Sequence, residues 1–146
     1  MIKQATALDV DRIAPLFDAY RVFYGQESDV EAAKVFLLER FEKGENVIFL
    51  ALENDVAVGF TQLYPTFSSV SMQQFYILND LFVAPEARKK GIGEQLLNHA
   101  KEFCKLKNSK GLTLETAADN PAQKLYERLG WEKDVSYLHY FWKNPK

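Results

Sequence analysis

The spacing of apolar residues in the first part of the chain predicts a short strand followed by two helices. Residues 2–6 form the strand, and the apolar positions from Asp9 to Gly25 recur at helical spacing, with Asp9 suited to the N-cap. Pro15 lies inside this pattern and predicts either a later helix start or a kink. Residues 28–31 match a capping box, in which a hydroxyl and a carboxylate satisfy free N–H groups, so a second helix should begin there and run to Gly44.

The rest of the chain alternates between apolar strand patterns and amphipathic helix patterns. Asn54 and Asp55 form a turn between two of the strands, which predicts a hairpin. The order from there is strand, strand, strand, helix, strand, helix and strand, at residues 46–53, 56–64, 72–83, 91–108, 111–116, 121–129 and 137–142.

Three consecutive strands followed by a strand–helix–strand unit indicate a mixed sheet rather than a uniformly parallel one. The fold class is therefore α/β in the broad sense (α+β): a mixed, mostly antiparallel central sheet flanked by helices, in the order β-α-α-β-β-β-α-β-α-β. No repeat or low-complexity linker divides the chain, and 146 residues is close to the usual size of one domain. We expect a single domain over residues 1–146.

Composition and charge argue against several classes of protein. The apolar runs fall short of a membrane span of about 18 residues, and charged residues interrupt the start, where a signal peptide would have its apolar core. Lys and Arg number 18 against 20 Asp and Glu, which gives a net charge of −2, whereas a nucleic-acid binder usually has a basic excess. Cys104 is the only cysteine, so no internal disulfide can form. We expect a cytoplasmic protein that binds neither membranes nor nucleic acid.

A turn between the strand at residues 72–83 and the next helix carries the clearest chemical signal. It reads Arg88-Lys-Lys-Gly91-Ile-Gly93. Glycines at such a turn let the backbone approach a ligand, and the free N–H groups and dipole of the helix start favour a phosphate or pyrophosphate. A dinucleotide fingerprint needs a third glycine where Leu96 stands, and a Walker A loop needs a Gly-Lys-Ser/Thr sequence that is absent. A glycine turn with solvated lysines is the remaining alternative.

Two segments together resemble the acetyltransferases of the GNAT superfamily. Residues 81–93 read Leu-Phe-Val-Ala-Pro-Glu-Ala-Arg-Lys-Lys-Gly-Ile-Gly, and they are similar to the family's acetyl-CoA signature, Arg/Gln-x-x-Gly-x-Gly/Ala after a Leu-x-Val strand. Residues 120–131 read Asn-Pro-Ala-Gln-Lys-Leu-Tyr-Glu-Arg-Leu-Gly-Trp, and they resemble the family's next characteristic segment. One helix and one strand separate the two segments, as in the family. The resemblance implies an acetyl-CoA-dependent N-acetyltransferase.

The resemblance also implies which residues hold acetyl-CoA. Backbone groups of residues 88–93 would bind the pyrophosphate. The strand at residues 81–83 would pair with the pantetheine amides beside a bulge that splays two strands, and Asn120 would lie along the pantetheine arm. The implied cofactor-binding set is Leu81, Phe82, Val83, Arg88, Lys89, Lys90, Gly91, Ile92, Gly93, Glu94, Asn120 and Tyr126.

Two residues are candidates for the proton transfers of the reaction. Tyr126 is similar to the tyrosine that acts as general acid in many GNAT enzymes, and its alternative role is that of a core aromatic packed with Leu129 and Trp131. Asn79 and Asp80 interrupt an apolar strand, where an uncompensated carboxylate would be costly. Asp80 is a proton acceptor, an anchor for a cationic amine, or a strand-end residue bonded to neighbouring backbone.

The acceptor site is suggested by a further similarity, to the spermidine/spermine acetyltransferases. Those enzymes read Leu-Glu-Asp where this chain has asparagine at Asn79, so their glutamate base is missing and a water chain ending on Asp80 would replace it. Residues 20–29 lie in the part of the fold that covers the acceptor in relatives. Among them, Tyr20, Tyr24, Glu27 and Asp29 would bind a cationic substrate together with Asn79 and Asp80. A plain helix end and turn is the alternative there. Residues 64–67 would form a second wall.

These residues predict a small amine acceptor, such as a polyamine or diamine. A protein or peptide acceptor, a regulatory module that binds CoA without turnover, and nucleotide binding by the glycine turn are the alternatives. Dimers are common in the family, so we expect a homodimer, with residues 137–142 as an interface. His99 and His139 lack metal-ligand spacing, so no metal is expected, and Cys104 should be a buried structural thiol.

Overall fold

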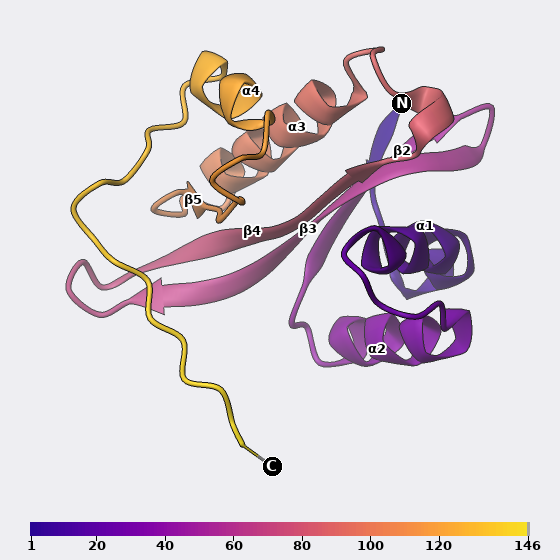
Figure 1. Ribbon diagram of the computed structural model, residues 1–146, viewed down its shortest axis with the longest axis horizontal. Helices are drawn as coiled ribbons and strands as arrows, with labels where there is room; N and C mark the ends of the chain where they lie inside the picture. Colours follow the sequence, from indigo (N-terminus) through magenta and orange to yellow (C-terminus); the bar gives the residue numbers. More distant parts are fainter. Residues whose placement is uncertain (146) are drawn as a thin grey trace. The chain divides into compact units, whose positions relative to one another are not determined.

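The computed structural model of the chain describes residues 1–145, which fall into two compact units that divide after Glu115. The first unit is built on a mixed five-stranded sheet (Figure 1), and the second contains a short helix. Over residues 1–145, no helix combines the length and apolar character that crossing a membrane requires. The single domain expected over residues 1–146 stays a prediction.

Every helix and strand expected as far as residue 129 is present, although several ends differ. The elements are β1 (Ile2–Gln4), the 3-10 turn η1 (Ala7–Asp9), α1 (Val10–Phe23), α2 (Val30–Glu42), β2 (Val47–Glu53), β3 (Val56–Ser68), β4 (Gln73–Val83), the 3-10 turn η2 (Pro85–Ala87), α3 (Ile92–Leu106), β5 (Leu112–Thr113) and α4 (Gln123–Arg128). β5 is much shorter than the strand expected at residues 111–116, because it pairs with only two residues of β4.

The last expected strand, at residues 137–142, is wrong. Residues 132–145 contain neither helix nor strand, and the side chains of Tyr140, Phe141 and Trp142 are 85%, 80% and 77% exposed. A strand is stable only when a neighbouring strand satisfies its N–H and C=O groups. The strand-forming composition of this segment therefore did not suffice to make one.

Thr6 and Asp9 fix the start of the first helical segment. They form a capping box at η1, in which Thr6 Oγ1 accepts from Leu8 N at 3.2 Å and Asp9 Oδ2 accepts from Thr6 N at 2.9 Å. α1 follows at Val10, so the later helix start that Pro15 suggested is wrong. Pro15 lies on the exposed side of the helix, where water can reach the carbonyl that loses its N–H partner.

The start of α2 differs from the capping box expected at residues 28–31. Asp29 is the N-cap, and its Oδ1 accepts from Ala32 N at 3.0 Å. Ser28 turns away, and its hydroxyl donates to Asp18 Oδ2 at 2.6 Å. The expectation was wrong because a buried carboxylate from α1 competes for the serine hydroxyl.

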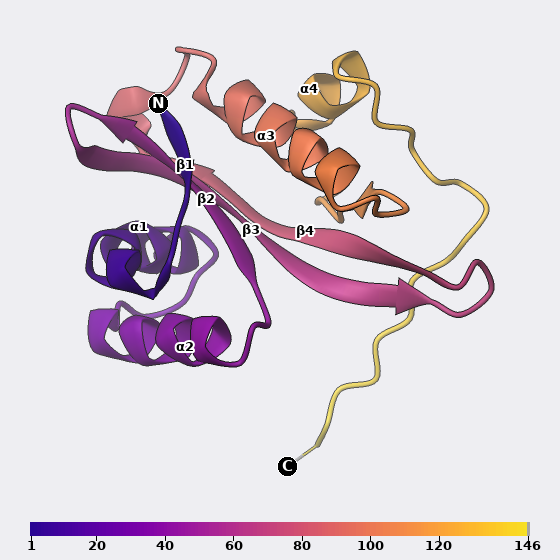
Figure 2. The same cartoon turned by 180° about the vertical axis from the view of Figure 1, so that it is seen from behind.

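The sheet has the strand order β1-β2-β3-β4-β5. The first four strands are antiparallel to their neighbours, and β5 runs parallel to β4, as expected for a mixed sheet. Asn54 and Asp55 connect β2 to β3 with φ angles of 50° and 63°, the left-handed conformation of a tight hairpin. α1 and α2 cover one face of the sheet, and α3 covers the other (Figures 1 and 2).

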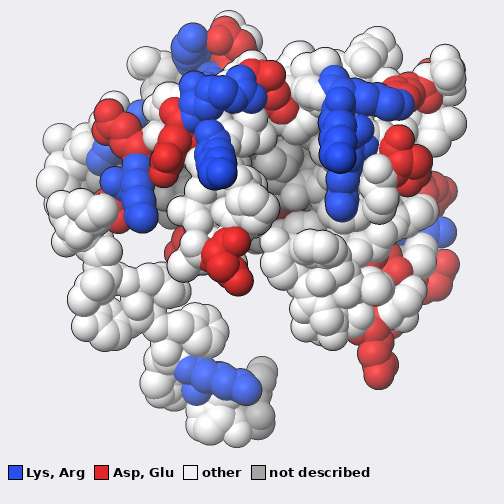
Figure 3. All heavy atoms as spheres, turned by 45° about the horizontal axis from the view of Figure 1, so that its top comes forward, with Lys and Arg blue, Asp and Glu red and all other residues white. Residues whose placement is uncertain are grey.

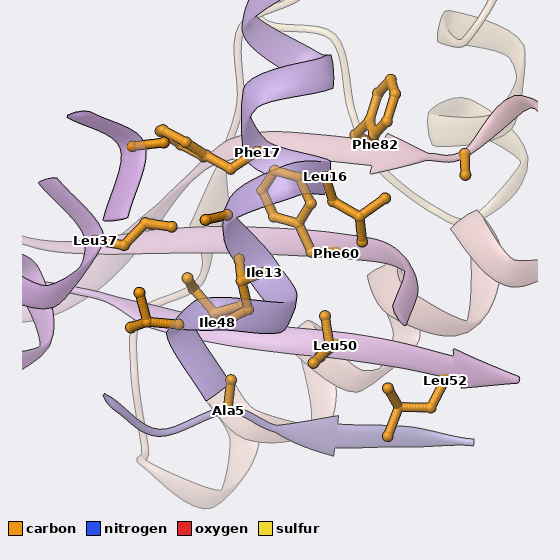
Figure 4. Close-up of a cluster of buried hydrophobic side chains, with 14 residues drawn as sticks. Ala5, Ile13, Leu16, Phe17, Leu37, Ile48, Leu50, Leu52, Phe60 and Phe82 are labelled. Carbon is orange, nitrogen blue, oxygen red and sulfur yellow. The ribbon is translucent and has the colours of Figure 1, made fainter. Parts of the chain in front are cut away.

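The hydrophobic core lies on both faces of this sheet. Under α1 and α2, side chains such as Ile13, Ile48 and Phe60 are fully buried (Figure 4). Under α3, the Phe103 ring packs against Phe49 at 5.6 Å between ring centres. The single thiol, Cys104, lies in this second layer and is 5% exposed, which confirms the expected buried cysteine.

A bulge interrupts β4 where the candidate site residues lie. The pairing with β3 passes from Leu63 opposite Leu78 to Gln62 opposite Asp80, so Asn79 is the extra residue. β5 pairs with β4 only at residues 76–77. Beyond that point the edge of β4 that faces away from β3 has no neighbouring strand among the described residues. The bulge expected beside residues 81–83 is therefore present, at Asn79, and the slot between splayed strands stays a prediction.

Candidate active site

The backbone between β4 and α3 passes through left-handed conformations. Lys89 has φ of 65° and Gly91 has φ of 78°. Gly91 is the N-cap of α3, and no side chain caps this helix start. The first N–H groups of α3, around Gly93 and the half-buried Glu94, can therefore bind an anion, which the helix dipole also favours. A Cβ added to Gly93 would meet no atom within 4 Å, so there is open space at this point.

Basic side chains surround the same turn. Arg88 Nε donates to Val83 O at 2.8 Å, and its guanidinium carbon lies 5.5 Å from the centre of the Phe82 ring. Lys90 Nζ is 3.5 Å from Glu53 Oε2. All three basic residues of the turn are exposed, and on the face in Figure 3 blue basic side chains lie among red acidic ones. The positive charge is therefore confined to this turn and does not extend over the whole face.

The end of β4 packs closely against β3, and its opposite edge has no paired strand among the described residues. Phe82 is buried, whereas Leu81 and Val83 are half-buried. Gly59 on β3 permits the close packing, because a Cβ there would lie 3.1 Å from Phe82 O and 3.4 Å from Ile92 Cγ2. The Ile92 side chain is itself buried, so only its backbone is available to a ligand.

Asp80 is a buried carboxylate held by side chains. Its Oδ2 accepts from Gln62 Nε2 at 2.8 Å and its Oδ1 accepts from Asn79 Nδ2 at 3.1 Å, while its main-chain oxygen accepts from the Thr61 hydroxyl at 2.8 Å. Burial raises the pKa of Asp80 above its usual value, and the side-chain hydrogen bonds oppose that rise. The groups that donate to the Asp80 carboxylate are therefore side chains. The alternative of a strand-end residue had assumed bonds to the neighbouring backbone instead.

Two tyrosines lie close to this carboxylate. The Tyr20 hydroxyl donates to Asn79 O at 3.4 Å, and the Tyr20 ring lies 6.0 Å from the ring of Phe82. Burial first, and then the charge of Asp80, raise the pKa of both Tyr20 and Tyr64. Both tyrosines therefore stay protonated at neutral pH, and Asp80 is the group of this cluster that can take up a proton.

Tyr20 was expected near the acceptor from the sequence, whereas Gln62 was missed. Gln62 links Asp80 to a further side chain, because its Oε1 accepts from Asn46 Nδ2 at 2.9 Å. A signal was available: Thr61 and Gln62 are adjacent polar residues in an apolar strand, as Asn79 and Asp80 are in the next one. Two such pairs in neighbouring strands of a hairpin indicate a shared polar site.

The segment between α1 and α2 brings Tyr24 to the cluster. Tyr24 is 59% exposed, and its ring lies 5.0 Å from that of Tyr20, which contacts the bulge. The exposed Glu27 accepts from Nη1 of Arg21, on the last turn of α1, through its main-chain oxygen at 3.2 Å. Tyr24 therefore adjoins the cluster through Tyr20, whereas this bond ties Glu27 to the end of α1.

A surface pocket of about 540 Å³ lies beside Tyr64, between the end of α2 and β3. We call it the α2 pocket. Tyr64 and Pro65, both expected to line an acceptor pocket, form its wall, but Phe67 lies outside it and is 74% exposed. The lining residues are Arg40, Lys43, Gly44, Glu45, Tyr64 and Pro65.

The second unit contains the two remaining candidates. Asn120 Oδ1 accepts from Ala122 N at 2.9 Å and shapes the turn before α4. The Tyr126 ring lies on α4, half-buried, with its centre 6.1 Å from that of Trp131. Tyr126 packs beside Trp131 without being buried in a core, and its role as an acid stays a prediction.

Comparisons with known proteins agree with this architecture. The sequence model of the acetyltransferase (GNAT) family matches residues 12–131. An uncharacterized N-acetyltransferase of Bacillus subtilis (strain 168), YhfO, is 53% identical over 140 residues, which cover 95% of this chain and 94% of that protein.

Solved structures give the same result. The crystal structure of a probable acetyltransferase superposes with a TM-score of 0.94 at 41% identity, over 100% of this chain and 99% of that chain. An aminoglycoside N-acetyltransferase in complex with CoA superposes with a TM-score of 0.79, over 99% of this chain and 95% of that chain. At 20% identity the second likeness shows a shared fold alone.

Proposed function

This chain belongs to the acetyltransferase (GNAT) family and is an N-acetyltransferase, and from that premise we propose that it acetylates the primary amine of a small molecule with acetyl-CoA. The observation that carries the proposal is the buried carboxylate of Asp80 at the bulge of β4, beside an open strand edge. An alkyl amine, with a pKa of about 10.4, is mostly charged at neutral pH and must lose a proton before it can attack. A proton acceptor beside a cofactor slot meets that need.

The turn before α3 fits the phosphates of acetyl-CoA. Its uncapped N–H groups and left-handed Gly91 favour an anion, and the open space at Gly93 admits a close approach of the ligand. Arg88, Lys89 and Lys90 add positive charge at the same place. Family membership makes acetyl-CoA the natural ligand, and one neighbour of the same fold is a complex with CoA.

The open edge of β4 suits the pantetheine arm. Residues 81–83 carry main-chain N–H and C=O groups beyond the end of the β4–β5 pairing, and an extended ligand with amide groups can pair with such an edge. We assign the N–H of Phe82 or Val83 as the donor that stabilises the negative charge developing on the carbonyl oxygen during transfer. Asn120 is assigned to the same arm.

The proton transfers are assigned to Asp80 and Tyr126. Acetyl-CoA supplies the acetyl group as an activated thioester. Asp80 accepts a proton from the substrate ammonium through water, and burial suits it to this role because its pKa is raised above the usual value. The neutral amine nitrogen then forms the C–N bond and releases its second proton to water as the C–S bond breaks. Tyr126 protonates the leaving sulfur and recovers a proton from that water.

The acceptor is a small primary amine, with diamines and polyamines the first compounds to test. Asp80 supplies a negative charge for an ammonium, and the aromatic faces of Tyr20 and Tyr24 can add cation–π attraction. We further infer that the enzyme works as a homodimer in the cytoplasm. The exposed aromatic segment at residues 137–142 suits a contact with a second copy, and one buried thiol suits a reducing compartment.

The test combines turnover with binding. Purified protein is mixed with acetyl-CoA and a panel of diamines, polyamines, amino acids and short peptides, and release of free thiol is followed alongside calorimetric titration with acetyl-CoA. We expect turnover with small amines, and a fall of about 100-fold or more in kcat for Tyr126→Phe and Asp80→Asn. Turnover of peptides alone would contradict the small-molecule acceptor. Binding of acetyl-CoA without turnover would contradict the catalytic role.

A further inference from the structure

The α2 pocket lies where β3 continues beyond its neighbour. Val47, the first residue of β2, pairs with Leu63, so Tyr64 and Pro65 have no β2 residue beside them. The end of α2 and the turn after it form the opposite wall. At about 540 Å³ the pocket is in the usual range for small-molecule sites.

The pocket adjoins the Asp80 cluster. Tyr64 and Gln62 are two residues apart on β3 and therefore share a face of the strand. Gln62 bonds to Asp80 at 2.8 Å on one side and to Asn46, next to the pocket residue Glu45, at 2.9 Å on the other. The charges of Asp80 and of Arg40 act in opposite directions on the pKa of Tyr64, so that phenol is within range of both.

The charged side chains of the pocket offer N–H donors to an anion. Arg40 is 20% exposed and is held by Glu45 (Nε to Oε1, 2.9 Å) and Glu39 (Nη2 to Oε1, 3.2 Å). Lys43 Nζ lies 2.7 Å from the same Glu39 oxygen. These ion pairs balance the two cations with two carboxylates, but they use only two of the five N–H donors of Arg40 and one of the three of Lys43. A polyamine would place further positive charge beside Arg40 and Lys43, whereas a carboxylate would bond to them.

We propose that the acceptor is an amine that also carries a carboxylate, with its amine at Asp80 and its carboxylate in the α2 pocket, bound by Arg40 and Lys43. The inference rests on the proposed function and narrows its substrate to amino-acid-type amines, including diamino acids. The Arg40 guanidinium is already held in place by its two glutamates and by the ring of Phe36, 4.7 Å away, so little freedom is lost on binding. The carboxylate is the group by which the enzyme distinguishes such an acceptor from a simple diamine.

Matched pairs of compounds test the proposal. Lysine and cadaverine differ by one carboxylate, as do ornithine and putrescine. Steady-state kinetics with acetyl-CoA, and calorimetric titration of each compound into protein saturated with CoA, are measured for the wild type, Arg40→Gln and Lys43→Gln. Lys34→Gln is the control on the same helix, because Lys34 pairs with Asp11 and Glu31 outside the pocket.

We expect the wild type to prefer each amino acid over its diamine by about tenfold in kcat/KM, the value of one charge-assisted hydrogen bond. Arg40→Gln and Lys43→Gln should raise KM and the dissociation constant for the amino acids. For the diamines both constants should stay the same or fall, because a like charge has been removed. Lys43 is 57% exposed, so its variant keeps the fold even if Arg40→Gln does not.

Equal or better binding of the diamines, or equal losses for both members of a pair in the variants, would overturn the proposal. A protein that binds amino acids in this way but never releases thiol would instead count against the proposed function, so the two failures are distinguishable.

Discussion

The side-chain amide of Gln62 on β3 donates to the carboxylate of Asp80 on β4 at 2.8 Å, beside the β-bulge that interrupts the pairing of the two strands. The two residues are direct partners in the pairing, and both are less than 5% exposed. The bulge therefore lies where a buried carboxylate joins a polar cluster. The residues of β4 that follow it have an open edge, because β5 pairs only with residues 76–77.

Replacing Asp80 by asparagine should remove the proton acceptor. We expect kcat/KM to fall by about 100-fold or more, the usual contribution of a general base. The wild-type kcat/KM should rise with pH through the raised pKa of Asp80, since only the ionised carboxylate accepts a proton. Rate profiles measured from acid to alkaline pH would show this rise in the wild type alone. An unchanged profile in Asp80→Asn would rule out Asp80 as the base.

The same carboxylate should affect stability in a pH-dependent way. The folded-state pKa of Asp80 lies above the usual value of 3.8, so between these values the folded protein holds a proton that the unfolded chain releases. The free energy of unfolding of the wild type should therefore fall, relative to Asp80→Asn, as pH rises from about 3.8 through the folded pKa, and the difference should be constant above it. Urea titrations of both proteins across that range measure this, and a difference independent of pH would contradict the raised pKa.

Tyr20→Phe should change the pH dependence of the reaction more than the stability of the fold. The Tyr20 hydroxyl lowers the pKa of Asp80 by hydrogen bonding, so its removal should raise that pKa further and shift the rise of kcat/KM to higher pH. The ring keeps its packing, and the stability loss should be about 1 kcal/mol. Tyr76→Phe is the control, because Tyr76 packs against Phe103 on the α3 face. If the rise of kcat/KM moved to higher pH in both variants, or in neither, the role of Tyr20 would be contradicted.

Gly93→Ala separates ligand binding from folding. The methyl group meets no protein atom within 4 Å, and alanine favours a helix, so stability should stay the same or rise by up to about 1 kcal/mol. If phosphate groups approach this backbone, the dissociation constant for acetyl-CoA should rise about tenfold or more. Calorimetric titration and thermal unfolding measure the two effects.

Gly25→Ala provides the opposite control. Its φ of 89° strains any other residue, so this variant should lose about 1–2 kcal/mol of stability and keep its affinity for acetyl-CoA. Unchanged affinity in Gly93→Ala would place the phosphates elsewhere.

The sequence predicted the helices and the first strands well, because each buries an apolar face whose spacing is visible in one dimension. It also predicted the turn before α3, where Gly91 is needed for a left-handed conformation. It failed where the outcome depends on a distant partner. Ser28 was expected as an N-cap, but its hydroxyl donates to Asp18 on another helix. Residues 137–142 have the composition of a strand, but within residues 1–145 no strand pairs with them. Gln62 was missed although its polar pair with Thr61 was visible in the sequence, because the register with β4 was needed to place it opposite Asp80.

Asp18 should fix the loop between α1 and α2 near the acceptor. It is 5% exposed and accepts from the Ser28 hydroxyl at 2.6 Å, from Asp29 N at 2.7 Å and from Arg21 Nη1 at 3.3 Å. The hydrogen bonds from Ser28 and Asp29 hold the pKa of Asp18 below its usual value of 3.8. Its stabilising contribution should therefore be complete above that value and be lost as pH falls through the folded pKa. Asp18→Asn should cost about 1–3 kcal/mol at neutral pH, measured by urea unfolding.

A structural defect alone would not show that Asp18 positions the loop for catalysis, so a matched carboxylate is needed. Asp9 is 4% exposed and accepts from Thr6 N and Lys3 Nζ at 2.9 and 3.0 Å, but it lies at the opposite end of α1. Asp9→Asn should lose a similar amount of stability and keep its KM for the acceptor amine. Asp18→Asn should raise that KM and speed amide hydrogen exchange at residues 26–29, because the loop beside Tyr24 is released. Equal KM values in the two variants would mean that Asp18 serves the fold and not the acceptor.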